Sequence, residues 1–437
     1  MHFYSTYNAN LACDLRTAVL QGLAPDGGLF MPSSFGSLEE SVLKKIPSLT
    51  FQELSFEMGK TLFADSLPHS ILKKVIDEAI TFDAPLVPLA HTADTAACEL
   101  FHGPTLSFKD FGARCMSRLM AHFMEKEEKE LSVLVATSGD TGSAVASGFL
   151  NVSGIRVYIL YPSAGVSDIQ EKQLTTYGGN ITALEIKGTF DDCQALVKQA
   201  FQDTELKNAK MLASANSINI ARLFPQTFYY AWACAQHWRL NTKNLPLVCS
   251  VPSGNFGNLT AGLIAKRIGI PITRFIAATN INNSVPRYLN TEVFSPHPSH
   301  TTISNAMDVG NPSNFARLME LYPNGAQQMK QDIWGVYFTD NETRDAMKRV
   351  YETTGYMLDP HGAVAYLGLE AYRHTHPDSV CGIFLETAHP AKFFQTVQNA
   401  IGMPPKIPER LSEVAAKEKK SFTLSNQFED LKNFLLA

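Results

Sequence analysis

Short apolar runs that favour β-strands alternate with helix-like stretches along most of this 437-residue chain. The runs are LSVLVA (131–136), IRVYIL (155–160), ITALEI (181–186), MLASAN (211–216), PLVCSV (246–251), ITRFIAATN (272–280) and VCGIFLE (380–386). Such alternation is typical of right-handed βαβ units, and near-continuous apolar strands are typical of parallel sheets covered by helices on both faces. The pattern predicts an α/β fold, and the number of units favours two sheets.

The composition is that of an ordinary globular protein, since 45% of the residues are hydrophobic and 18% are charged. A net charge of −5 offers no basic surface to a nucleic acid or an anionic membrane. No run approaches the ~18 apolar residues of a membrane span, and the first residues lack the pattern of a signal peptide. The 7 cysteines never form CxxC and are expected to be reduced. We therefore expect a cytoplasmic protein without a nucleic acid or membrane partner.

Two segments lie outside the strand–helix alternation. Residues 1–90 hold mixed short elements and the loop GLAPDGGLFMP, carry no motif that points to chemistry, and are interpreted as an N-terminal accessory domain. Pro404, Pro405 and Pro408 interrupt the chain before its last region. This pattern predicts a linker into a terminal helical segment.

Two loops that follow predicted strands carry the residue types of anion sites. Pro252 to Asn258, PSGNFGN, precedes a predicted helix, and glycines at a helix N-terminus let backbone N–H groups surround a phosphate. The alternative is an ordinary strand-to-helix turn, which also favours Gly and Asn. Thr137 to Ser143, TSGDTGS, suits a carboxylate or phosphate by the same argument. Its alternative is a helix N-cap made by a Ser or Asp.

Other common sites have no support in the sequence. The chain contains no GxG dinucleotide motif, no HExxH or paired CxxC, and no GxSxG elbow, and Gly59-Lys60-Thr61 lacks the first glycine of a P-loop. The pairs His297/His300 and His374/His376 are interpreted as loop or surface histidines. We therefore predict no metal site.

Lys109 stands in the run ELFHGPTLSFKDFGAR (99–114). A lysine in such a position is usually a surface residue. Its apolar neighbours Leu106, Phe108 and Phe111 could instead desolvate the amine and lower its pKa, as an imine-forming or proton-carrying lysine requires. A desolvated lysine together with a phosphate loop suggests pyridoxal 5'-phosphate as the cofactor.

Five motifs in order, ELFHGPTLSFKDFGAR, TSGDTGSA, NSINIARLFPQ, PSGNFGN and ETAHPAKF, resemble the threonine synthase family. The N-terminal pattern YSTYN followed by QGLAPDGGLFMP is similar to its microbial branch with a long N-terminal region. The resemblance implies a fold-type-II pyridoxal phosphate enzyme, related to the tryptophan synthase β-subunit, with two doubly wound α/β domains that enclose the cofactor. The implied domains are 1–90 (accessory), 91–120 with 235–437 (large, cofactor-binding) and 121–234 (small). The implied reaction converts O-phospho-L-homoserine and water to L-threonine and phosphate.

The resemblance also implies roles for individual residues. Lys109 matches the lysine that binds the cofactor aldehyde, and Thr387 matches the hydroxyl residue at the pyridine nitrogen. The remaining implied cofactor contacts are Phe108, Asp140, Gly254, Asn255, Phe256, Gly257 and Asn258. The implied substrate contacts are Ser138, Gly139 and Thr141 for the carboxylate, and Ser217, Asn219 and Arg222 for the phosphate. Arg222 has the alternative of a structural ion pair.

Two other functions remain open at this stage. A phospholyase with the same cofactor would release 2-oxobutyrate and ammonia instead of adding water. A silent relative would bind the cofactor or a partner without turnover, although the retention of Lys109 beside an intact PSGNFGN loop argues against it. The expected partner is a small-molecule substrate, and the expected assembly is a monomer or homodimer.

Overall fold

The computed structural model describes the chain except residues 93, 165, 241–244 and 377. The chain divides into two compact units, and each is described here by itself. Unit 1 comprises Met1, residues 31–108 and residues 223–406, and unit 2 comprises residues 2–30, 109–222 and 407–437. One boundary falls between Lys406 and Ile407, within the stretch predicted as a linker. The predicted domains group 407–437 with 235–406, whereas contacts group these residues with unit 2.

A six-stranded sheet forms the centre of unit 1. Its order is β12 (Ile333–Tyr337), β11 (Arg274–Thr279), β10 (Leu247–Pro252), β13 (Cys381–Glu386), β5 (Thr95–Glu99) and β4 (Leu86–Pro88). All neighbours are parallel except β4 and β5. Ser250 pairs with Ile276 on one side and with Phe384 on the other. The three strands predicted here are confirmed, whereas β4, β5 and β12 were not predicted.

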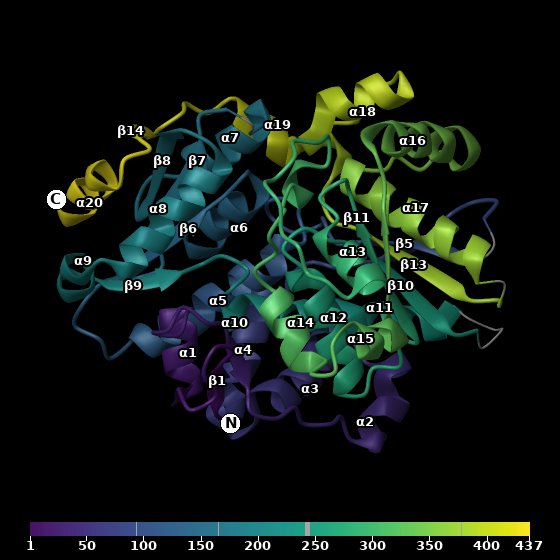
Figure 1. Cartoon of the computed structure of the whole chain (residues 1–437), viewed down its shortest axis with the longest axis horizontal. Helices are drawn as coiled ribbons and strands as arrows, with labels where there is room; N and C mark the ends of the chain where they lie inside the picture. Colours follow the sequence, from purple (N-terminus) through teal and green to yellow (C-terminus); the bar gives the residue numbers. More distant parts are fainter. Residues whose placement is uncertain (93, 165, 241–244, 377) are drawn as a thin grey trace. The chain divides into compact units, whose positions relative to one another are not determined.

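Helices cover both faces of this sheet (Figure 1). Phe275 and Ile276 are neighbours in β11 and therefore point to opposite faces. A methyl group on Gly262 of α12 would meet the Phe275 ring, and one on Gly368 of α17 would meet Ile276. The helices of unit 1 are α2 (Glu40–Lys45), α3 (Phe51–Phe63), α4 (His69–Ala79), α11 (Gln226–Leu240), α12 (Gly257–Arg267), α13 (Ser284–Thr291), α14 (Phe315–Leu321), α15 (Ala326–Asp332), α16 (Asp340–Thr354), α17 (Pro360–Thr375) and α18 (Phe394–Ile401), with 3₁₀ turns η1 (Ile46–Ser48), η2 (Ala64–Ser66), η3 (Asn305–Met307) and η4 (Pro390–Phe393).

Unit 2 is built on a five-stranded sheet whose neighbours are all parallel. Its order is β14 (Phe422–Ser425), β8 (Ile181–Lys187), β7 (Ile155–Pro162), β6 (Leu131–Ala136) and β9 (Met211–Ser214). The four strands predicted between residues 131 and 216 are confirmed. The fifth strand, β14, lies in the region predicted to be helical.

Helices also pack on both faces of the unit 2 sheet. Leu160 belongs to a core cluster with Leu196 of α8 and Leu431 of α20. Ile159 points the other way, and a methyl group on Gly142 of α6 would lie 2.9 Å from it. The helices are α1 (Leu15–Gln21), α5 (Lys109–Met124), α6 (Asp140–Phe149), α7 (Asp168–Thr175), α8 (Phe190–Gln202), α9 (Thr204–Ala209), α19 (Glu409–Ala415) and α20 (Phe428–Leu436). Strands β1 (Phe3–Ser5) and β2 (Ala12–Cys13) form an antiparallel pair, and β3 (Phe30–Pro32) and α10 (Ile220–Leu223) lie at the unit boundaries.

Local sequence sets the ends of many helices, as α16 shows. The Thr339 hydroxyl accepts from the Glu342 N–H, and the Glu342 carboxylate accepts from the Thr339 N–H at 2.7 Å, which is a capping box. Gly355 ends the helix with a left-handed φ of 73°.

Two sequence expectations concern the whole chain. The 7 cysteines are free thiols, as expected. Among the described residues, no helix combines the length and apolar character that a bilayer crossing needs.

Candidate active site

The carboxyl ends of β10, β11 and β13 lie at one edge of the unit 1 sheet because these strands are parallel and adjacent. Loops that follow such strand ends are the usual ligand sites of α/β proteins. The loop after β10 holds Ser253 to Asn258, here called the phosphate loop, and the loop after β13 holds Thr387. The structure therefore brings two predicted cofactor segments to the same edge.

The phosphate loop has the backbone geometry of an anion site. Phe256 adopts a left-handed φ of 61°, and Gly257 begins α12, whose first-turn N–H groups have no partner within the helix. Gly254 has no room for a side chain, since a Cβ there would lie 2.8 Å from the Ala306 carbonyl oxygen and 2.9 Å from Met307 Cα. Only glycine fits there without a backbone shift.

Asn258 supplies a buried donor that matches a ligand anion. Its Oδ1 accepts from the hydroxyls of Tyr229 at 2.5 Å and Tyr230 at 2.7 Å. Burial raises the pKa of both tyrosines well above the usual value, so both hydroxyls remain donors. Asn258 Nδ2 is buried and has no hydrogen-bond partner among the described residues. An orphaned buried N–H group is costly, and an acceptor such as a phosphate oxygen would satisfy it.

Residues 302–314, here called the covering segment, pack on the phosphate loop. The N–H groups of Ser313 and Asn314 donate to the Asn255 side chain and carbonyl, at 3.1 and 3.3 Å. No predicted strand or motif marks this segment in the sequence, so it was not among the predicted site residues.

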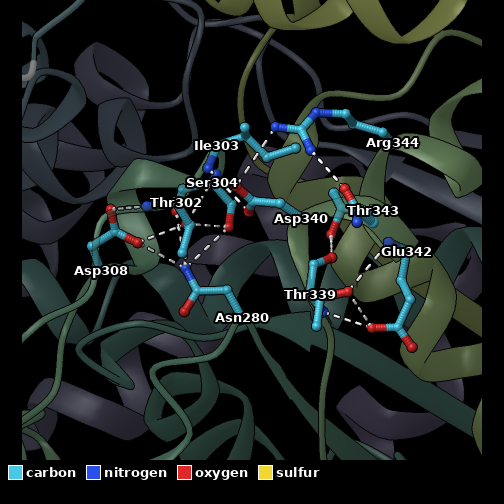
Figure 2. Close-up of polar contacts among 11 residues, drawn as sticks. Asn280, Thr302, Ile303, Ser304, Asp308, Thr339, Asp340, Glu342, Thr343 and Arg344 are labelled. Carbon is cyan, nitrogen blue, oxygen red and sulfur yellow. Dashed lines mark hydrogen bonds and ion pairs between the residues drawn. The ribbon is translucent and has the colours of Figure 1, made fainter.

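Asp308 anchors the covering segment to the end of β11 (Figure 2). Its carboxylate accepts from the Thr302 N–H at 3.0 Å, the Thr302 hydroxyl at 2.7 Å and the Asn280 amide at 2.9 Å. Burial raises the pKa of Asp308 to about 6, although the hydrogen bonds from Thr302 and Asn280 oppose the shift. Burial therefore disfavours the charged form of Asp308, whereas the hydrogen bonds that it accepts stabilise this form.

Thr387 is buried, and its backbone is paired with the segment that leads into α5. The Phe108 N–H donates to the Thr387 carbonyl at 2.9 Å, and the His389 N–H donates to the Leu106 carbonyl at 3.0 Å. Ser107 and Ala388 form the bridge between these two bonds. Phe108 and Thr387, both predicted cofactor contacts, are thus brought together.

Next to Thr387 lies a cluster of three buried ionisable side chains, Asp359, His361 and Glu386, which were not predicted from the sequence. Asp359 and Glu386 are each 0% exposed and His361 is 2% exposed. Burial raises the pKa of Glu386 well above its usual value, and the Asp359 charge adds to the rise. Burial would also raise the pKa of Asp359, but its hydrogen bonds, first among them that with His361, lower it. Glu386 therefore holds a proton while Asp359 stays ionised.

In unit 2, Lys109 is the first residue of α5 and is half-buried. Of its predicted apolar neighbours, Leu106 and Phe111 are buried and Phe108 is half-buried. Asp110 is fully buried. The next turn of α5 packs closely, since a Cβ on Gly112 would lie 2.7 Å from the Arg222 carbonyl oxygen.

The loop at 137–143 is held by its own side chains and by α7. Thr137 Oγ1 accepts from the N–H groups of Gly139 at 3.0 Å and Gly142 at 2.9 Å. Gln170 donates to Asp140 Oδ1 at 2.8 Å, a contact between two buried side chains. The N-cap of α6 is Gly139, which has no side chain, so the hydroxyl of Thr137 rather than a Ser or Asp caps the first turn, through the Gly142 N–H. The alternative that a Ser or Asp caps this helix is therefore wrong, whereas an anion site at its N-terminus remains compatible with the geometry.

The three residues predicted to bind the substrate phosphate, Ser217, Asn219 and Arg222, make different contacts in the structure. Both amide hydrogens of Asn219 are taken, by the carbonyls of Val19 at 2.9 Å and Ser214 at 3.0 Å. Arg222 donates to the Ala215 carbonyl at 2.6 Å. Burial lowers the pKa of Arg222 to about 10, and the Asp110 charge partly opposes this. Arg222 is therefore charged at neutral pH, and Ser217 is half-buried beside this turn.

The described residues contain no group of three or more His, Cys, Asp or Glu side chains that could hold a metal ion.

Comparison with known proteins gives matches over the whole chain. A family of pyridoxal-phosphate dependent enzymes matches residues 82–385, the threonine synthase N terminus matches residues 2–80, and the threonine synthase C-terminal family matches residues 363–435. The threonine synthase of Serratia marcescens is 43% identical over 437 residues, which is 100% of this chain and 99% of the relative. That of Saccharomyces cerevisiae is 34% identical and covers 92% of this chain and 91% of the relative.

Solved structures of threonine synthases are also similar to this chain over its whole length. The crystal structure of threonine synthase from Escherichia coli has a TM-score of 0.92 and 41% identity, and covers 100% of this chain and 99% of that one. The PLP-bound threonine synthase from Brucella melitensis has a TM-score of 0.90 and 31% identity, with the same coverage.

Proposed function

This chain belongs to the threonine synthase family of pyridoxal-phosphate-dependent enzymes, and we propose that it converts O-phospho-L-homoserine and water to L-threonine and phosphate, with Lys109 as the residue that binds the cofactor. The assignment of this reaction rests on sequence identity above 40% with several threonine synthases over their full length. We also propose roles for individual residues from the geometry of each unit.

The phosphate loop binds the cofactor phosphate. The N-terminal N–H groups of α12 and the buried Nδ2 of Asn258 supply donors, and the positive end of the helix dipole favours the negative charge. Gly254, Asn255, Phe256 and Gly257 shape the loop through its tight packing and left-handed turn. The Thr387 hydroxyl bonds the pyridine nitrogen, and Phe108 fixes the Thr387 backbone.

When bound, pyridoxal phosphate supplies an aldehyde for covalent attachment and a ring that delocalises electrons from the substrate. Lys109 contributes the amine that joins the aldehyde. The free amine of Lys109 would take protons from the α- and β-carbons of the substrate and return them at later steps. A half-buried lysine at the start of a helix suits this task because partial desolvation favours the neutral amine.

Unit 2 binds the charged groups of the substrate. Ser138, Gly139 and Thr141 hold the carboxylate at the N-terminus of α6, while Asp140, fixed by Gln170, contacts the cofactor. Arg222 and Ser217 bind the phosphate, and Arg222 stabilises it as a leaving group. Both amide hydrogens of Asn219 are already bonded to backbone carbonyls in this conformation. Asn219 therefore acts on the phosphate indirectly, by holding the turn in place.

We further propose that the protein acts in the cytoplasm as a monomer or homodimer on a small-molecule substrate. Its net charge of −5 supports the absence of a nucleic acid partner.

The covalent link is tested by reducing the holoenzyme with borohydride and mapping the labelled peptide. We expect the label on Lys109 and its loss in Lys109→Ala. A label on Lys392, which is fully buried, would contradict the assignment. Incubation with O-phospho-L-homoserine separates the reactions, since a threonine synthase yields mainly threonine, whereas 2-oxobutyrate as the main product would favour the phospholyase.

A further inference from the structure

Asp359 and His361 form a buried pair at the start of α17. Asp359 caps the helix by accepting from the His361 N–H at 2.8 Å. The same carboxylate oxygen lies 2.6 Å from His361 Nδ1. Because both residues are at most 2% exposed, water does not compete with these contacts.

The protonation of His361 follows from its second contact. The backbone N–H of Ala306 points to His361 Nε2 at 3.2 Å. A backbone N–H can only donate, so Nε2 carries the lone pair and Nδ1 carries the hydrogen that Asp359 accepts. The neutral ring thus links Asp359 to Ala306 by one hydrogen bond on each side.

Through Ala306, the pair reaches the phosphate loop. Ala306 and Met307 are the residues whose backbone lies against Gly254, where even a Cβ would be too close. A shift of Ala306 would therefore move or release Gly254. His361 holds the covering segment at this contact, and Asp308, two residues further along, holds it to Asn280.

Through Asp359, the pair reaches Thr387. The second carboxylate oxygen of Asp359 accepts from the Ala388 N–H at 3.4 Å, and the Asp359 N–H donates to Glu386 Oε2 at 3.3 Å. Both residues next to Thr387 in the chain are thus bonded to Asp359. Glu386 is also packed tightly against Gly362 of α17, where a Cβ would lie 1.9 Å from its Oε1.

We propose that Asp359 and His361 are positioning residues that place the phosphate loop and Thr387 relative to each other, so that one buried pair sets both contacts of the cofactor in unit 1. The inference rests on the proposed function, which assigns the cofactor phosphate to the phosphate loop and the pyridine nitrogen to Thr387. It adds two residues that touch neither group and act through Ala306 and Ala388.

The test compares two probes, pyridoxal phosphate and pyridoxal, which lacks the phosphate. His361→Leu removes the acceptor for the Ala306 N–H, and we expect the dissociation constant of pyridoxal phosphate to rise about tenfold. That of pyridoxal should change much less. His361→Gln, whose Oε1 can accept the same N–H, should recover most of the affinity. Equal weakening of both probes, or no weakening, would overturn the positioning of the phosphate loop.

The link to Thr387 has its own readout. Asp359→Asn keeps the shape of the side chain but removes its charge, and we expect a shift in the visible absorption band of the bound cofactor. An unchanged band would refute this half of the inference. If His361→Leu does not fold, His361→Gln still tests the pair, because it should also shift the band by losing the bond to Asp359.

Two reference variants separate the possible causes of a change. Thr189→Ala removes the cap of α8 in unit 2, outside the unit that holds the pair, and should lower stability without altering the affinity ratio of the two probes. Asn258→Ala tests the phosphate loop directly. If Asn258→Ala leaves the ratio unchanged, the proposed function of the loop fails, whereas an effect of Asn258→Ala without one of His361→Leu refutes only the inference.

Discussion

The backbone N–H of Phe108 donates to the backbone carbonyl of Thr387 across 2.9 Å. Lys109 follows Phe108 directly in the chain, so the peptide that carries the proposed cofactor lysine is attached to the residue proposed to face the pyridine nitrogen. Because the bond joins main-chain atoms, substitutions of the Thr387 side chain leave it in place. The hydroxyl can therefore be tested separately from the position of the segment.

The Thr387 hydroxyl is expected to be required for turnover but not for cofactor retention. Thr387→Val has nearly the same shape and lacks only the hydroxyl, so we predict a loss of kcat of about tenfold to a hundredfold, because a buried group that loses its hydrogen-bond partner costs about 1–3 kcal/mol. Thr387→Ser keeps the hydroxyl and should recover most of the rate. Steady-state kinetics with the absorption spectrum of each holoenzyme measure this, and equal rates for the Val and Ser variants would contradict it.

Gly254→Ala should weaken cofactor binding strongly. The new Cβ would lie 2.8 Å from the Ala306 carbonyl oxygen and 2.9 Å from Met307 Cα, and backbone atoms cannot move aside as a flexible side chain can. We expect at least a tenfold higher dissociation constant for pyridoxal phosphate, measured by absorbance titration. Gly355→Ala is the control, because it strains a left-handed residue in open space and should reduce stability alone. Unchanged affinity in Gly254→Ala would show that the loop opens freely.

Gln170→Leu should affect both stability and substrate binding. It removes the amide that donates to the buried Asp140 carboxylate, and such a loss costs about 1–3 kcal/mol of unfolding free energy. Because Asp140 begins α6, we also expect a higher KM for O-phospho-L-homoserine. Thr175→Val in the same helix removes only a hydroxyl bond to the Glu171 carbonyl and should leave KM unchanged. Denaturant titration and kinetics check the two effects, and a normal KM in Gln170→Leu would separate Asp140 from substrate binding.

Asp308 should give the apoprotein a characteristic pH dependence. Burial raises the pKa of Asp308 to about 6, whereas an unfolded chain has ~3.9. The native state thus binds this proton more tightly, and its contribution to stability is greatest at low pH and is lost as pH rises from about 4 to about 6. Asp308→Asn lacks this titration. The unfolding free energy of the wild type minus that of the variant should fall across this range and level off above it, and a flat difference would show that Asp308 has an ordinary pKa.

Strong local patterns explain which parts of the fold could be predicted. The apolar runs that became β6, β7, β10, β11 and β13 are almost entirely buried on both faces, and this burial requires the continuous hydrophobic sequence that marks them. Strand β12 is largely half-buried, and β14 is half-exposed at the sheet edge, so their sequences carry a weaker signal. Propensity alone does not identify such edge strands.

The residues of the candidate site likewise differ in whether a local sequence pattern marks them. PSGNFGN and the run around Lys109 are local motifs, so they can be recognised from the sequence. Asp359, His361 and Glu386 are single polar residues in apolar surroundings, and their meeting with Ala306 depends on the packing of α17 against the sheet. No short-range pattern predicts such a contact. Gln170 was missed for the same reason, since its partner lies on another helix.

Strand β14 pairs with β8 at the edge of the unit 2 sheet, and it is among the last residues of the chain. During synthesis on a ribosome, β8 is made long before β14, so one row of its amide and carbonyl groups remains unpaired until β14 has been made. Such an unpaired strand edge is a template to which strands of other molecules can pair. A nascent or truncated chain that stops before residue 422 should therefore self-associate, and the pairing of β14 with β8 prevents this.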